Sequence, residues 1–222
     1  MTPAAVLVMA KAPVPGQVKT RLEPLFSPEE CAQLQTTLIE RTVRWALDTA
    51  SAGFAYLAYD PPAAGAAMAA LVPGEVRLVP QPGGDLGERL RHATAHVFAR
   101  ASGPLFVVGV DTRLTAAHAR TALAELDAGA DVAFGPALDG GYYLVALSGP
   151  APELFAIHAG AWGGEEVLDR SLAAARAAGL RAATIALERD LDTPDDAAEL
   201  VGDPEIGGQI AVALARRRHG RE

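Results

Sequence analysis

The sequence is poor in the residues that build disulfide-rich proteins, thiolate metal clusters and nucleic-acid binders. Its 222 residues include one cysteine, Cys31, which excludes an internal disulfide and a zinc site made of several thiolates. Lysine and arginine number 19 against 27 aspartates and glutamates, so the formal net charge is −8. A general nucleic-acid binder carries a basic face, and the charge balance argues against that class. Aromatic residues are only 5%, so alanine, leucine and valine must build most of the core.

Long hydrophobic runs are also missing. No apolar stretch approaches the roughly 20 residues needed to span a bilayer. Lys11 follows the N-terminal apolar run instead of preceding it, which is unlike a signal peptide. We therefore expect a cytoplasmic protein that does not insert into membranes. Hydrophobic residues make up 50% of the chain and charged residues 21%, which excludes global disorder and favours a large core.

Short apolar runs alternate with helical patterns along the chain. Strands are predicted at 4–10, 54–59, 75–80, 104–110, 131–135, 142–147 and 182–187. Helices are predicted at 28–49, between 60 and 74, and at 85–100, 116–127, 165–178 and 194–201. A C-terminal helix and basic tail are expected at 204–222. This alternation predicts one α/β domain over residues 1–222, whose mostly parallel sheet carries helices on both faces.

In such a sheet the ligand lies beyond the carboxyl ends of the strands, and the first loop at that edge is rich in cations. It contains Lys11, Gly16, Lys19, Thr20 and Arg21. Backbone N–H groups and cationic side chains in a loop of this kind can wrap a polyphosphate. The spacing of a Walker A loop is absent. The alternative interpretation is a solvated basic loop.

Two aspartates that follow strands are candidates for a metal site. Asp111 ends the strand predicted at 104–110, and Asp192 follows the last predicted strand. Mg²⁺ (or Mn²⁺) is commonly held by one or two carboxylates together with phosphate oxygens and water. Each aspartate also has a structural alternative. Asp111 can be a turn or cap residue, and Thr193 and Pro194, next to Asp192, have the form of a helix start.

Two glycine-rich segments are candidates for binding the organic parts of a ligand. In the segment 81–87, the glycines Gly84 and Gly87 allow close backbone approach to a flat ring such as a base, and Gln81 offers an amide to its edge. Asp85 in the same segment has the form of a helix cap. Ordinary turn chemistry explains these glycines equally well.

The second glycine-rich segment is 139–143. Gly140 and Gly141 form a tight turn, which can place the Asp139 carboxylate and the Tyr142 hydroxyl in the pocket. Trp162 lies among glycines further along the chain. It either lines an acceptor pocket or is a buried core aromatic.

Five segments occur in an order that resembles a known family. They are VLVMAKAPVPGQVKTRL, QPGGDLGERL, VVGVD, GPALDGGYYLVAL and DLDTPDD. They look like the bacterial glycosyltransferase-A-like proteins of the radical-SAM/selenodomain-associated type. That family is similar in turn to the molybdenum-cofactor, phospholactate and sugar-acid nucleotidylyltransferases. The resemblance covers nearly the whole chain and implies a nucleotide-diphospho-sugar transferase (GT-A-like) fold.

The resemblance also implies roles for the candidate residues. The loop 11–21 would hold nucleotide phosphates, with Lys19 and Arg21 neutralising charge during transfer, and the segment 81–87 would lie near the base. Asp111 and Asp192 match metal-binding aspartates of relatives. Asp139, Gly140, Gly141, Tyr142 and Trp162 fall where the acceptor is expected. The expected partners are therefore a nucleotide or nucleotide-sugar donor and a small acceptor, with the oligomeric state left open.

The chain departs from the family after the metal aspartate. Relatives usually continue with Cys-Pro or a similar pair, whereas this chain has Thr112 and Arg113. The added cation could bind phosphate or alter substrate choice.

These observations lead to three hypotheses for the function. The first is Mg²⁺-dependent nucleotidyl transfer from a nucleoside triphosphate to a phosphorylated or carboxylate acceptor. The second is glycosyl transfer from a nucleotide-sugar, in which Asp139 orients or deprotonates the acceptor, and the third is a nucleotide-binding module without turnover.

Overall fold

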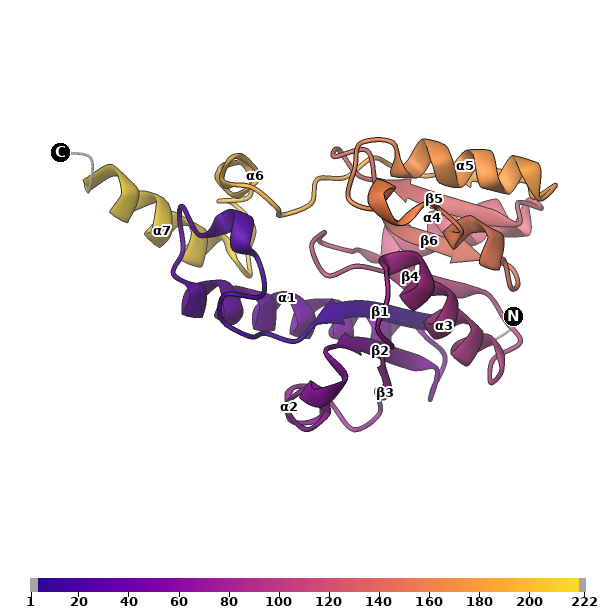
Figure 1. Ribbon diagram of the computed structural model, residues 1–222, viewed down its shortest axis with the longest axis horizontal. Coiled ribbons are helices and arrows are strands. Elements are labelled where there is room, and N and C mark those ends of the chain that lie inside the picture. Colours follow the sequence, from indigo (N-terminus) through magenta and orange to yellow (C-terminus); the bar gives the residue numbers. More distant parts are fainter. Residues whose placement is uncertain (1–3, 220–222) are drawn as a thin grey trace.

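Seven strands form one sheet in the order β3-β2-β1-β4-β6-β5-β7 in the computed structural model, which describes residues 4–219 (Figure 1). β6 is antiparallel to both of its neighbours, and every other pairing is parallel. The strands are β1 (Ala5–Lys11), β2 (Ala55–Asp60), β3 (Arg77–Pro80), β4 (Leu105–Val108), β5 (Val132–Pro136), β6 (Tyr142–Leu147) and β7 (Ala182–Thr184).

Helices cover both faces of this sheet. The α-helices are α1 (Pro28–Thr49), α2 (Gly65–Leu71), α3 (Leu86–Phe98), α4 (Ala116–Asp127), α5 (Val167–Ala177), α6 (Pro194–Glu199) and α7 (Gly207–His219). The described residues also form short 3₁₀ helices: η1 (Thr20–Leu22), η2 (Pro62–Ala64), η3 (Pro152–Phe155) and η4 (Ala159–Ala161).

Alternating side chains of the central strands supply two separate cores. On one face Val6 and Val8 of β1 pack with residues of α1, α4, α6 and α7. On the other face Ala5 and Leu7 pack with residues of α3, α5 and η3. Because successive strand residues point to opposite faces, a strand buried on both sides must be apolar throughout, as the run at β1 is. The predicted α/β class with a mostly parallel sheet is confirmed.

Two strands end earlier than predicted, and in both cases the residues that follow lie at the carboxyl edge of the sheet. β4 ends at Val108 instead of residue 110, although Gly109 N still donates to the Tyr143 carbonyl of β6 at 3.3 Å, and Asp111 follows beyond this last contact. β7 ends at Thr184 instead of residue 187. The register of β5 shifts at Gly135 and Pro136, which interrupts regular pairing there. Beyond Pro136, an isolated parallel bridge between Ala137 and Glu188 pairs the chain that follows β5 with the chain that follows β7.

The chain beyond residue 200 forms the helix expected at the C-terminus. Arg216 of α7 pairs with Glu30 of α1 at 2.7 Å between Nη2 and Oε1. The remaining side chains of the predicted basic tail, and residues 220–222, lie outside the described part of the chain. Within residues 4–219, no helix has the length and hydrophobicity required to cross a bilayer.

Candidate active site

The loop after β1 delivers Lys19 to the carboxyl edge of the sheet. Gly16 turns the chain with φ of 73°, and Lys19 itself adopts φ 51° and ψ 31°. Among the described residues Lys19 is the one non-glycine with positive φ. This conformation costs an L-residue roughly 1–2 kcal/mol. The Lys19 carbonyl accepts hydrogen bonds from Leu22 N, at 2.8 Å, and from the Cys31 thiol, at 3.4 Å, which hold the loop.

The Lys19 ammonium lies between the two predicted metal aspartates. Its Nζ is 2.7 Å from Asp111 Oδ1 and 3.6 Å from Asp192 Oδ1, and it donates to the carbonyl of Leu191. The lysine side chain is only 5% exposed, whereas the two carboxylates are 37% and 36% exposed. Arg21 reaches Asp192 alone, at 3.3 Å, and is 67% exposed.

Neither of these aspartates caps a helix. α4, the helix after Asp111, is capped by Thr115. α6 is capped by Thr193, whose side chain and that of Asp196 form a reciprocal capping box. The helix start predicted beside Asp192 is therefore real, but it uses the next residue. Both carboxylates remain available to the pocket.

Asp190 is a site residue that the sequence interpretation missed. It lines the same pocket and accepts a hydrogen bond from the Thr112 hydroxyl. Burial raises the pKa of Asp190 to about 7, and the charges of Asp111 and Asp139 add to the effect. Burial also raises the pKa of Asp192, with the neighbouring Asp111 as a further cause. The local sequence shows only an apolar residue, Leu191, between two aspartates. That Leu191 is fully buried and that both aspartates line the pocket is known from the structure.

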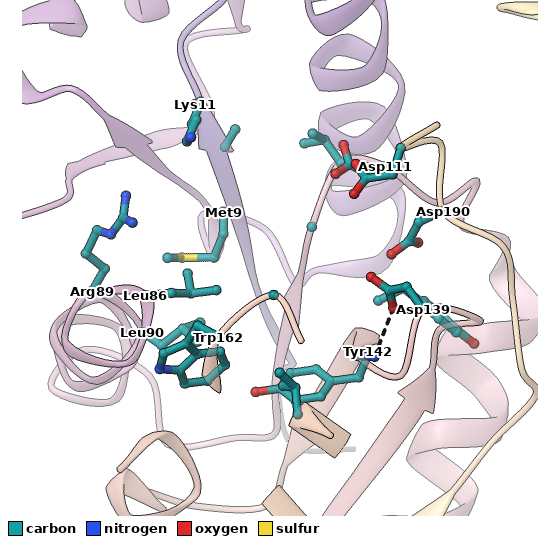
Figure 2. A pocket seen from close by; sticks show the side chains of 18 of the residues that line it. Met9, Lys11, Leu86, Arg89, Leu90, Asp111, Asp139, Tyr142, Trp162 and Asp190 are labelled. Atoms are coloured by element: carbon teal, nitrogen blue, oxygen red, sulfur yellow. Dashed lines mark hydrogen bonds between the residues drawn. The ribbon is translucent and has the colours of Figure 1, made fainter. Parts of the chain in front are cut away.

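The turn at 139–141 brings a third carboxylate to this end of the pocket. Asp139 Oδ1 accepts from Gly141 N at 2.9 Å, and Figure 2 shows the Asp139 carboxylate facing that of Asp190. Gly140 has φ of 87°, and a Cβ there would lie 2.0 Å from the Glu165 carbonyl oxygen. The turn thus depends on glycine for both its backbone conformation and its packing.

The segment 81–87 reaches the pocket through only some of its predicted residues. Gln81 lines it, but the amide nitrogen donates to Ala58 O at 2.8 Å and Ala10 O at 3.4 Å. Asp85 also lines it and caps α3 by accepting from Glu88 N at 2.8 Å. The Gln81 amide nitrogen therefore bonds to backbone carbonyl groups near the ends of β1 and β2. The amide oxygen is the atom left to bind a ligand.

Four predicted glycines shape the surrounding loops instead of lining the pocket. They are Gly16, Gly84, Gly87 and Gly140. Gly87 shows why such a position excludes a side chain. A Cβ there would lie 2.3 Å from the Phe155 carbonyl oxygen and 3.0 Å from Trp162 Nε1. The predicted contacts of these four glycines with a ligand stay predictions.

The predicted acceptor residues divide between two walls of the pocket (Figure 2). Trp162 lies beside Leu86 and Leu90 of α3, whereas Asp139 lies on the carboxylate side. The Tyr142 ring extends from the carboxylate side toward Trp162. Its hydroxyl is buried and has no hydrogen-bond partner among residues 4–219, and burial raises the pKa of Tyr142. Tyr142 therefore offers a ligand its ring more readily than an ionisable oxygen.

The whole pocket encloses about 720 Å³, within the usual range for small-molecule sites. The predicted residues that line it are Lys11, Lys19, Thr20, Arg21, Gln81, Asp85, Asp111, Asp139, Gly141, Tyr142, Trp162 and Asp192. Its charge is divided. Lys11 and Arg89 lie on one side, and the carboxylates of Asp111, Asp139 and Asp190 lie on the other (Figure 2). Arg89 is partly neutralised by Asp60, at 3.0 Å.

Arg113 does not extend this site. Its Nε lies 3.9 Å from Asp203 Oδ2, and Arg113 does not line the pocket. The expectation that it adds a cation for phosphate beside Asp111 is therefore corrected. Thr112 is 4% exposed, and its hydroxyl donates a hydrogen bond to Asp190. The two residues that suggested a module without turnover thus have structural partners and leave the pocket residues in place.

Comparison with known proteins places the fold. Residues 42–163 match a family model described as an uncharacterized protein conserved in bacteria. A crystal structure from Desulfovibrio desulfuricans, provisionally named a nucleotide-diphospho-sugar transferase, is 25% identical with a TM-score of 0.83, over 99% of this chain and 96% of that one. No curated protein matches the sequence significantly.

Two more distant structures show the fold alone. CMP:2-keto-3-deoxy-manno-octonic acid synthetase complexed with CTP is 13% identical, with a TM-score of 0.54 over 90% of this chain and 97% of that chain. A Mycobacterium tuberculosis protein in complex with manganese is 19% identical, with a TM-score of 0.51 over 91% and 100%. The fold is thus the one found in nucleotide-diphospho-sugar transferases, as the sequence predicts.

Proposed function

The chain belongs to DUF2064, a family of uncharacterized proteins conserved in bacteria, and we propose that it is a metal-dependent, nucleotide-using transferase. The reaction we favour moves a nucleotidyl group from a nucleoside triphosphate to a small phosphorylated or carboxylate acceptor. The observation that carries the proposal is the meeting of Lys19, Asp111 and Asp192 in one pocket at the carboxyl edge of the sheet. This combination of a lysine and two carboxylates suits a metal-bound polyphosphate.

The residues fit a hard divalent cation. Asp111 and Asp192 offer only carboxylate oxygens, which Mg²⁺ and Mn²⁺ favour. A cation, the Lys19 ammonium, already contacts both carboxylates. Within residues 4–219, no three His, Cys, Asp or Glu side chains are arranged as a ready metal centre. Two carboxylates suffice for an ion that takes its other ligands from phosphate and water.

In the proposed reaction an acceptor oxygen attacks the α-phosphorus, and the bond from that phosphorus to the bridging oxygen of the β-phosphate breaks. Pyrophosphate leaves with the bonding electron pair. A bound divalent ion would supply charge neutralisation and a template for the phosphate oxygens. The protein must hold the two anions in line and offset the charge that develops. Lys19 and Arg21 perform the second task, and Lys11 and Thr20 line the pocket beside them.

The acceptor binds on the side of Asp139, Gly141 and Tyr142, with Trp162 on the facing wall. Asp139 Oδ1 is held by Gly141 N, so the second oxygen of that carboxylate is the one left for an acceptor hydroxyl. Trp162 and Tyr142 present ring surface, which suits the apolar face of a ring in the acceptor. The base end comprises Gln81 and Asp85, near the start of α3.

Glycosyl transfer from a nucleotide-sugar is the second candidate. Two observations favour it: the likeness to the Desulfovibrio desulfuricans protein, with its TM-score of 0.83, and the position of Asp139, whose second oxygen can orient or deprotonate an acceptor hydroxyl. In this reaction the nucleoside diphosphate leaves and no pyrophosphate forms.

Product identification separates the two reactions. The protein is incubated with Mg²⁺ and each nucleoside triphosphate, or each common nucleotide-sugar, against a panel of sugar phosphates and sugar acids. Nucleotidyl transfer predicts pyrophosphate from a triphosphate together with a new acceptor–nucleotide conjugate. Release of nucleoside diphosphate from a nucleotide-sugar, with no pyrophosphate from any triphosphate, would replace the first proposal by the second.

A further inference from the structure

We propose that Lys19 is a displaceable cation that holds Asp111 and Asp192 together until metal and phosphate enter the pocket. In this account the ammonium gives up the carboxylates to the incoming ion and moves to phosphate oxygens. The inference rests on the proposed function, because it takes Asp111 and Asp192 as the metal ligands. It adds a coupling between metal and phosphate binding that the proposed reaction alone does not require.

Three oxygen atoms surround the Lys19 ammonium. Asp111 Oδ1 lies 2.7 Å from Nζ, the Leu191 carbonyl accepts a hydrogen bond from it, and Asp192 Oδ1 lies 3.6 Å away. A lysine side chain that is only 5% exposed must keep its charge paired. These carboxylates therefore also stabilise the Lys19 side chain in its buried position.

The carboxylates need a cation as much as Lys19 needs an anion. Asp111, Asp139 and Asp190 lie on the same side of the pocket (Figure 2). Asp192 lies 3.6 Å from the same Lys19 ammonium as Asp111, so four carboxyl groups face one region. Lys19 is the one described cation that contacts both Asp111 and Asp192 within 4 Å; Arg21 contacts Asp192 only. Removing the Lys19 charge leaves the pair repelling until another cation replaces it.

A divalent ion bound by both aspartates competes with Lys19 for the same oxygens. Two cations in that space repel each other strongly in a partly buried site. Four rotatable bonds allow the ammonium to leave while its backbone stays bonded to Leu22 N and Cys31. Polyphosphate supplies the anion that Lys19 loses. Metal without phosphate therefore binds weakly, and each ligand strengthens the other because coupling is reciprocal.

The test measures Mn²⁺ binding in the absence of nucleotide, by electron paramagnetic resonance and by the thermal unfolding midpoint. The Lys19→Met variant is expected to unfold at a lower temperature than wild type in EDTA. It should bind Mn²⁺ at least about tenfold more tightly than wild type, and Mn²⁺ should restore its stability. Lys19→Gln gives a second neutral variant if Lys19→Met folds poorly.

Arg21→Met is the matched control, because it removes a charge of the same sign that contacts only Asp192 and is largely exposed. A general electrostatic effect would tighten Mn²⁺ binding equally in Arg21→Met and Lys19→Met, and that result would overturn the inference. So would an affinity in Lys19→Met no higher than in wild type.

The doubly substituted protein Lys19→Met, Asp111→Asn distinguishes a failure of the proposed metal site from a failure of the proposed displacement of Lys19. If its Mn²⁺ binding equals that of Lys19→Met, Asp111 is not a ligand, and the proposed metal site fails together with the inference. If binding depends on Asp111 but is unchanged by the lysine substitution, the metal site stands and only displacement by Lys19 is wrong. Tight binding in Lys19→Met that is lost in the double variant supports both.

Discussion

The Lys19 ammonium lies 2.7 Å from the Asp111 carboxylate, although the two residues are separated by three strands and two long helices in the sequence. The contact joins the loop that follows β1 to the chain that leaves β4, and these strands are neighbours in the sheet. Parallel strands end at the same edge, so their loops meet there. The chemistry proposed for this protein depends on that meeting point.

Replacement of Asp139 tests the reaction type. Asp139→Asn keeps an oxygen that can accept from Gly141 N, so the turn should persist. Nucleotidyl transfer to a phosphate or carboxylate needs no proton removed from the acceptor, and we expect kcat to fall by less than about tenfold. A base for glycosyl transfer would cost roughly 10²–10⁴-fold. Steady-state kinetics measures the difference, and a loss of the larger size would contradict nucleotidyl transfer.

Removal of Arg113 should leave ligand binding unchanged. Arg113 lies against Asp203, which retains Arg41 as a partner at 3.2 Å. We expect nucleotide and Mn²⁺ affinities within about twofold of wild type for Arg113→Ala in calorimetric titrations. Arg21→Ala is the comparison, since it removes a cation that does line the pocket. A large loss in Arg113→Ala would restore a phosphate role for that side chain.

Gly87→Ala should displace Trp162. The new methyl group would lie 2.3 Å from the Phe155 carbonyl oxygen and 3.0 Å from Trp162 Nε1, so the backbone and the indole must both shift. Overpacking of this kind costs roughly 1–3 kcal/mol, measured by urea denaturation, and should raise KM for the acceptor. Gly83→Ala is the control, because nothing lies within 4 Å of a Cβ there. Equal stability of the two variants would show that the Trp162 wall is adaptable.

The stability of the metal-free protein should fall as pH rises from about 4 to about 7. Burial raises the pKa of Asp190 from 3.8 to about 7 in the folded protein. Across that window the folded state holds a proton that the unfolded state has released, so the free energy of unfolding decreases with pH. One such group contributes at most about 1.4 kcal/mol per pH unit. Asp190→Asn should gain stability over wild type at pH 8 and little at pH 4 in urea denaturation; the same difference at both values would contradict the assignment.

Local sequence signals predicted most of the fold. The apolar run at 4–10 and the cap at Asp85 each act within a few residues. The early ends of β4 and β7 were not predictable in the same way. They depend on the strand that lies alongside, β6 for β4 and β5 for β7, which the local sequence does not identify.

The site shows a similar division between local and long-range information. The sequence predicted which loops carry Lys19, Asp111 and Asp192, because each follows a recognisable strand. It did not predict that Asp190 shares their pocket, or that Arg113 lies against Asp203, because both depend on side-chain directions set by distant segments. The assignments of Trp162 to the acceptor and of the segment 81–87 to the base stay predictions; the structure adds that Trp162 lies against Gly87 of that segment.

The most direct test of the central claim is thermal unfolding of wild type and Asp111→Ala with nucleoside triphosphates and nucleotide-sugars, each with and without Mg²⁺ or Mn²⁺. A ligand at 100 times its Kd stabilises the folded state by about 2.7 kcal/mol, which raises the unfolding midpoint of a chain this long by roughly 5–10 °C. The account predicts a shift of that size for one ligand class in wild type, dependent on metal and lost in Asp111→Ala. No metal-dependent shift with any ligand, or an equal shift in Asp111→Ala, would contradict it.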